Sequence, residues 1–107
     1  MMPLEGAMLR LKNAADRLNR ESDKLAKTLA EFEDELNSYD IGVSCWHEGI
    51  GYAKLDGKWR LVVEYAGQTV ALVHASRIVR IEAVEKLDGL VRLLTEKVES
   101  YLSSFSL

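Results

Sequence analysis

Several residue types are scarce in this sequence, and each shortage excludes a class of protein. Only one of the 107 residues is a cysteine, Cys45, so neither an internal disulfide nor a metal site with several thiolates can form. No apolar run approaches the roughly 18 residues that a membrane-spanning helix needs. The first residues also lack the basic and apolar regions of a signal peptide. We therefore expect a cytoplasmic protein with no membrane segment.

Basic residues are also few. The chain has 14 Lys and Arg against 17 Asp and Glu, a net charge of -3 at pH 7. Nucleic acids and anionic membranes are bound by basic surfaces, so neither is an expected partner. The apolar fraction of 48% and the charged fraction of 29% are typical of a globular protein, and the length favours a single domain over 1–107.

The first third of the chain predicts one long helix, from Pro3 to about Asn37. An apolar residue recurs at alternating spacings of four and three, which forms a seam along one side of a helix. Ser22 interrupts this seam, and because Ser and Asp favour helix caps, a break into two helices there is an alternative. The seam consists of Leu4, Met8, Leu11, Ala15, Leu18, Leu25, Leu29, Phe32, Leu36 and Tyr39.

The middle of the chain predicts a four-stranded antiparallel meander. Glu48-Gly49, Asp56-Gly57 and Ala66-Gly67 are taken as two-residue hairpin turns, of which Asp-Gly is the strongest signal. This register pairs residue 47 with 50, 55 with 58, and 65 with 68. It collects most apolar side chains on one face and small or polar ones on the other, and it leaves the first and fourth strands as open edges.

A second helix is predicted from near Ser76 to about Ser103, with apolar residues again three or four apart. Gly89 lies inside this helix, and we interpret it as a position where another element approaches closely. The order helix, four strands, helix predicts an α+β fold. Because the number of strands is even, both helices are expected on the apolar face of the sheet and antiparallel to each other.

The two helices are longer than the sheet, and this predicts self-association. A helix of about 34 residues is roughly 50 Å long, whereas a strand of seven residues spans roughly 23 Å. We expect the overhanging parts, Leu4 to Leu18 and Arg92 to Phe105, to lie together and to form a four-helix bundle with a second copy. The predicted homodimer interface comprises Leu4, Met8, Leu11, Ala15, Leu18, Leu94, Val98, Tyr101 and Phe105.

No motif in the sequence predicts catalysis, a cofactor or a metal. Cys45 and His47 lie two apart on a strand, which separates their side chains by about 6–7 Å and is awkward for a nucleophile and its base. His47 and His74 fall on opposite edge strands, beyond the reach of a shared metal. Gly49-Ile50-Gly51 lacks the third glycine and the following helix of a dinucleotide-binding loop. The chain is therefore not predicted to be an enzyme.

Two other surfaces are candidates for binding. Lys54, His74, Arg77 and Arg80 are expected near the start of the second helix, where an anion would be favoured. The alternative is that they pair with acidic residues at the end of the first helix. The thin face of the sheet is the second candidate, as a surface for a protein partner with Trp46 as its anchor. Its predicted residues are Trp46, Leu55, Arg60 and Val62.

Two hypotheses for function follow. The first is a non-enzymatic interaction or adaptor protein that dimerises through its helices and presents a sheet surface to a partner. The second is a small-ligand protein that binds an anion at the basic end of the sheet. Light scattering tests the first hypothesis, and thermal stabilisation by anions tests the second.

Overall fold

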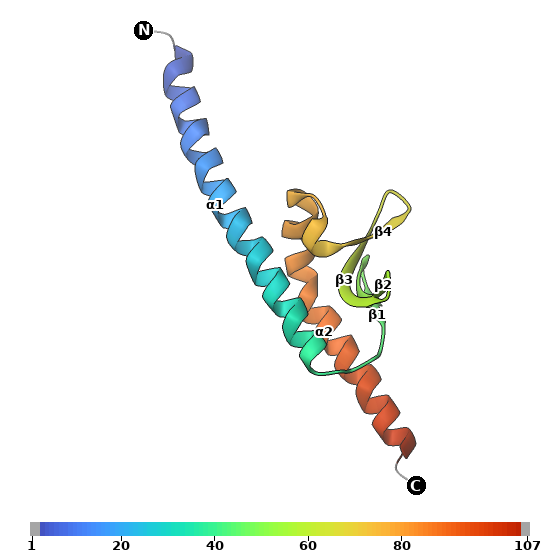
Figure 1. Ribbon diagram of the computed structural model, residues 1–107. Helices are drawn as coiled ribbons and strands as arrows, with labels where there is room; N and C mark the ends of the chain where they lie inside the picture. The colour runs from blue at the N-terminus through green and yellow to red at the C-terminus, as the bar shows by residue number, and fades with distance from the viewer. Residues whose placement is uncertain (1–2, 106–107) are drawn as a thin grey trace.

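The computed structural model describes residues 3–105 and has the predicted α+β class and order of elements (Figure 1). Helix α1 (Pro3–Ser38) leads into strands β1 (Cys45–His47), β2 (Ile50–Leu55), β3 (Lys58–Tyr65) and β4 (Gln68–Ala71). A short 3-10 helix, η1 (Leu72–His74), then connects to helix α2 (Arg77–Phe105). The alternative of a helix broken at Ser22 is wrong, because α1 is continuous.

The strands form an antiparallel sheet in the order β1-β2-β3-β4, with the predicted register. His47 pairs with Ile50, Leu55 with Lys58, and Tyr65 with Gln68. Both residues of each turn have positive φ, for example 52° at Asp56 and 82° at Gly57. These are the dihedrals of type I′ turns, whose twist matches that of the strands.

The hydrophobic core lies between the apolar face of the sheet and the two helices. Strand residues Tyr52 and Leu61 are fully buried there, together with Leu29 from α1 and Leu90 from α2. Gly89 packs against β1 as predicted, since a Cβ on it would lie 2.3 Å from His47 Nε2. The helices therefore cover the face that the sequence pattern selects.

The predicted antiparallel arrangement of the helices is wrong, because α1 and α2 run in the same direction (Figure 1). Arg80 near the start of α2 bonds to Ser22, while Leu94 further along α2 lines the same groove as Leu36. The reason is the length of β4, which ends at Ala71, opposite Val62 in the middle of β3. The chain leaves the sheet there, and α2 starts from the opposite end to the one expected.

As a result, the two overhanging helix segments lie at opposite ends of the molecule, not side by side as predicted (Figure 1). The first half of α1 extends beyond the sheet at one end, and the last turns of α2 extend at the other. The molecule measures 79 × 24 × 21 Å. Within one copy the two apolar overhangs therefore cannot pair with each other.

The polar position in the seam of α1 has a specific partner. Ser22 is buried, and its hydroxyl oxygen accepts a hydrogen bond of 3.3 Å from Arg80 Nη2. Arg80 Nη1 donates to the carbonyl oxygen of Ala75, 2.8 Å away. Arg80 thus links both helices and the turn between η1 and α2. Its buried Nε has no hydrogen-bond partner among residues 3–105, so an apolar residue at position 22 would leave a second nitrogen of the guanidinium unpaired.

Candidate functional site

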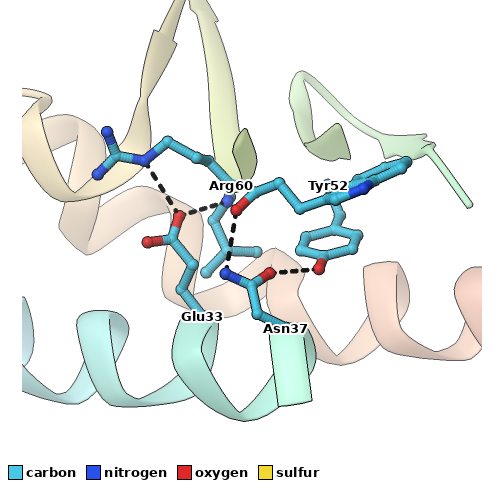
Figure 2. Close-up of polar contacts among 6 residues, drawn as sticks. Glu33, Asn37, Tyr52 and Arg60 are labelled. Atoms are coloured by element: carbon cyan, nitrogen blue, oxygen red, sulfur yellow. Dashed lines mark hydrogen bonds and ion pairs between the residues drawn. The ribbon is translucent and has the colours of Figure 1, made fainter. Parts of the chain in front are cut away.

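The most elaborate polar cluster joins the end of α1 to the sheet (Figure 2). Glu33 and Asn37 are four residues apart, so they lie on the same flank of α1. Glu33 Oε1 accepts a hydrogen bond of 2.7 Å from the backbone N–H of Leu61. Asn37 Nδ2 donates to the carbonyl oxygen of Trp59 at 3.1 Å. Two side chains of the helix thus bind two backbone groups of β3.

These contacts replace a missing strand. In the observed register, the backbone groups of Trp59 and Leu61 point toward the side of β3 on which β4 lies. Strand β4 stops at Ala71, opposite Val62, so it cannot reach them. Unpaired backbone groups inside a protein are costly, and an open edge invites another strand. Glu33 and Asn37 therefore provide partners for two of the edge groups of β3 and occupy the position that an added strand would take.

Other polar groups of this cluster also have partners within the protein. Arg60 Nε lies 3.6 Å from Glu33 Oε1, so Arg60, a residue of the predicted thin face, has a charge partner within the protein. The Tyr52 hydroxyl donates to Asn37 Oδ1, and the Tyr52 ring stacks on Trp59 with centroids 5.3 Å apart. Burial, and then the negative charge of Glu33, raise the pKa of Tyr52.

An open cleft of about 460 Å³ lies beside the cluster, with Asp34, Asp40 and Lys58 on its walls. The carboxylate oxygen Glu33 Oε1 already binds Leu61 and Arg60, and both ends of the Asn37 amide are bonded. A ligand that used Glu33 Oε1 or the Asn37 amide would have to compete with bonds that hold the sheet to α1. The geometry therefore indicates a structural junction.

A second, apolar feature lies between the end of α1 and α2. This apolar groove has a volume of about 330 Å³. Beside it the Tyr39 hydroxyl donates to Glu35 Oε1 at 2.9 Å; this bond, with smaller effects of desolvation and of the Glu35 charge, raises the pKa of Tyr39. The residues that line the groove are Leu36, Tyr39, Ile41, Val91, Leu94, Thr95, Val98 and Glu99.

The segment of residues 4–18, which we call the N-terminal arm, carries the largest exposed apolar residues of α1. Leu4 is 63% exposed, and Met8 and Leu11 are each 60% exposed. They continue the seam that Leu29 and Leu36 form inside the core of the same helix. At the other end of the molecule Tyr101 and Phe105 are likewise exposed on α2. The arm and the apolar groove contain seven of the nine predicted interface residues.

The four residues of the predicted anion site are not gathered at one place. Lys54 lies over the ring of Trp59, 6.0 Å from its centroid, beside the Asn37 end of α1. Arg80 is bonded to Ser22. Ser22 precedes Asn37 by fifteen residues in α1, so the two positions are roughly 22 Å apart along the helix. His74 and Arg77 are exposed near the start of α2. The predicted alternative is that these four basic residues pair with acidic residues at the end of α1. Glu33, one of those acids, forms its ion pair with Arg60 instead.

The predicted partner surface on the thin face is smaller than expected. Val62 is 0% exposed and cannot contact a partner, and Arg60 is paired with Glu33. Trp46, Gly51 and Val62 form one row across the sheet. The Trp46 ring lies on Gly51, where a Cβ would be 2.7 Å from Trp46 Cδ2. Trp46 remains substantially exposed, and Leu55 is half-buried.

Strand β1 is one of the two predicted open edges. Two lysines of α2 donate hydrogen bonds to the backbone residues that flank it. Lys86 Nζ donates to the carbonyl oxygen of Glu48 at 3.0 Å, and Lys97 Nζ donates to that of Ser44 at 2.6 Å. Sequence reasoning missed these roles and those of Glu33 and Asn37. For Glu33 and Asn37 the sequence does show a polar pair four residues apart beside the apolar seam. The backbone groups that this pair binds could not be predicted, because they depend on where β4 ends.

Chemically reactive groups are few in the described part of the chain. Cys45 Sγ has a weak contact of 4.0 Å with the carbonyl oxygen of Trp46, and His47 Nε2 lies 3.7 Å from Glu48 Oε2. Residues 3–105 hold no group of three or more His, Cys, Asp or Glu side chains placed to bind a metal ion. Neither described helix has the length and apolar character needed to cross a membrane.

Comparison with known proteins adds no information on function. A scan against protein-family models gives no match, and searches of curated proteins and of solved structures give none either.

Proposed function

We propose that this protein is a non-enzymatic interaction protein that self-associates through its helices and displays its sheet to a protein partner. The observation that carries the proposal is the seam of α1. The same apolar face that packs into the core at Leu29 and Leu36 continues onto the N-terminal arm, where Leu4, Met8 and Leu11 are exposed. Contiguous exposed apolar surface of this kind is typical of interaction sites.

The length of the arm supports the same proposal. The arm extends α1 by 15 residues beyond its packed part, and most helical stability in proteins comes from tertiary packing of an apolar face. Along this segment only Ala15 is even partly buried within the protomer. A helix without tertiary contacts can gain stability by packing against a partner. A second copy of this chain carries the same exposed apolar seam and is the partner that we propose. We therefore expect a dimer in solution.

A matched pair of variants tests the proposal. Leu9 and Leu11 are each 60% exposed, but Leu11 lies on the seam and Leu9 on the opposite side of the helix. Each leucine buried at an interface contributes about 1.5–3 kcal/mol. A symmetric dimer contains the change twice, so Leu11→Glu should weaken the dissociation constant by at least roughly 100-fold. Leu9→Glu should have little effect on it.

The measurement is sedimentation equilibrium across a concentration series, with circular dichroism to verify that both variants stay folded. A wild-type chain that is monomeric at all concentrations would refute the proposal. Equal weakening by both variants would show that the seam is not the interface. Trp46→Ala, on the thin face of the sheet, is expected to leave the mass of the dimer unchanged. The reason is that this face is proposed to bind a different protein and not the second copy.

A further inference from the structure

We propose that two copies of this chain pair antiparallel, with the N-terminal arm of each copy seated in the apolar groove of the other. This inference rests on the proposed self-association and specifies its geometry. The arm offers an apolar ridge at one end of the 79 Å molecule, and the groove between α1 and α2 lies toward the other end (Figure 1). A two-fold axis across the middle of the molecule brings each ridge to a groove.

The positions of the residues along the helices fit this arrangement. Because α1 and α2 run in parallel, Ser22 and Arg80, which are 58 residues apart, lie at the same height, as do Leu36 and Leu94. An axis near Leu25, about halfway between the two helix ends, places Leu11 of one copy level with the groove of the second. Both arms are then covered at once, and the assembly closes as a dimer.

Charges on α1 select the same orientation. Residues 3–20 carry four basic and two acidic side chains, whereas residues 29–40 carry five acidic ones and no basic one. This distribution opposes the helix dipole, which favours acids at the N-terminus and bases at the C-terminus. In an antiparallel pair, Arg10 of the arm comes level with the acidic end of the partner's helix. The distribution is then favourable between copies, although it is unfavourable within one helix.

Other pairings of the same surfaces are disfavoured by the same charges. If two arms packed against each other, their basic side chains would meet at close range. If two copies of α1 ran in parallel, basic would face basic and acidic would face acidic along the whole helix. Glu99, on the wall of the groove, supplies a further negative charge at the height that Arg10 reaches in the antiparallel arrangement.

Disulfide trapping tests the geometry, in a Cys45→Ser background so that no native thiol takes part. Leu11→Cys is mixed with Thr95→Cys or with Val98→Cys, two groove positions about one turn apart. A disulfide requires Cα atoms within about 7 Å. We expect a covalent dimer in at least one mixture and none from any variant alone. The double variant Leu11→Cys/Thr95→Cys or Leu11→Cys/Val98→Cys should stop at a dimer.

Each other result has a definite meaning. Cross-linking of Leu11→Cys with itself would show that arm meets arm and would overturn the inference. A ladder of higher oligomers from a double variant would show an open chain and would also overturn it. A wild-type dimer that gives no mixed cross-link refutes this geometry but leaves the proposed function standing. A wild-type monomer in sedimentation refutes both.

Charge reversal provides a second, independent readout. Arg10→Glu should weaken the dimer at least tenfold, and Arg10→Glu/Glu99→Arg should recover most of that loss. The control is Arg20→Glu, which lies on the side of α1 opposite the seam and should change the dissociation constant by less than threefold. Failure of Glu99→Arg to rescue Arg10→Glu would contradict the proposed contact between the arm and the groove.

Discussion

Replacing Glu33 should reveal how much the open edge of β3 depends on α1. The residue is 8% exposed, and its Oε1 accepts the Leu61 N–H at 2.7 Å. A hydrogen bond to a charged group contributes about 1.5–3 kcal/mol, and leaving a buried N–H without a partner costs a similar amount, so the two figures describe the same loss and are not added. The ion pair with Arg60, whose side chain is 27% exposed, is long at 3.6 Å and adds at most about 1 kcal/mol. We expect Glu33→Ala to cost about 2–3 kcal/mol.

The ranking of variants separates the hydrogen bond from the charge. Glu33→Gln keeps an oxygen that can accept the Leu61 N–H, so its cost should be only about 1 kcal/mol. Glu31→Ala, an exposed neighbour on the same helix, should stay within about 0.5 kcal/mol of the wild type. For a domain of this size, 2–3 kcal/mol corresponds to a decrease in Tm of roughly 10–20 °C.

The assay is urea unfolding followed by circular dichroism at one fixed protein concentration, because dimerisation would otherwise shift the apparent stability. The free energies of unfolding are compared between variants whose m values, the slopes of the unfolding free energy against urea concentration, are equal. A loss below about 0.5 kcal/mol for Glu33→Ala would refute the reasoning, since an open strand edge would then cost nothing. Equal losses for Glu33→Gln and Glu33→Ala would show that the charge, not the backbone bond, is what matters.

Two further predictions concern other contacts. Gly89→Ala should destabilise by at most about 1 kcal/mol, because its Cβ would lie 2.3 Å from His47 Nε2, which is the far end of a side chain that can move aside, and because Ala has the better helix propensity. Urea unfolding of Gly89→Ala/His47→Ala should show a smaller loss than the two single changes added together, and strict additivity would contradict the steric explanation. Because the folded protein raises the pKa of Tyr52, the unfolded chain loses that proton first, so stability should fall as the pH rises above 10.0. Unfolding free energies of Tyr52→Phe across this range should decline less steeply than those of the wild type, and identical slopes would exclude the Tyr52 contribution.

Local signals were sufficient for much of the sheet. The pairs Glu48-Gly49, Asp56-Gly57 and Ala66-Gly67 have the backbone preferences of tight turns, and a two-residue turn leaves one register for the strands it joins. The alternation of apolar and polar residues then selects the buried face. The long helix and its apolar seam follow equally from local spacing, because the period of a helix is a property of the backbone.

The end of β4 could not be predicted in this way. The alternation continues from Val70 through Leu72 to His74 as it would in a longer strand, yet the chain leaves the sheet after Ala71. Leu72 instead turns into the core, where it is fully buried. This choice depends on the packing of residues that are far apart in sequence, so local propensity does not show it.

Spacing along the chain was thus enough to establish which segments are helix or strand, how the strands pair and which faces are apolar. Packing between distant segments settled the direction of α2, the use of Glu33 and Asn37 to complete β3, and the separation of the two apolar overhangs. The physical reason is the distance along the chain over which each kind of interaction acts. Turn dihedrals and side-chain periodicity act over a few residues, whereas the direction of a helix on a sheet depends on the free energy of the whole core.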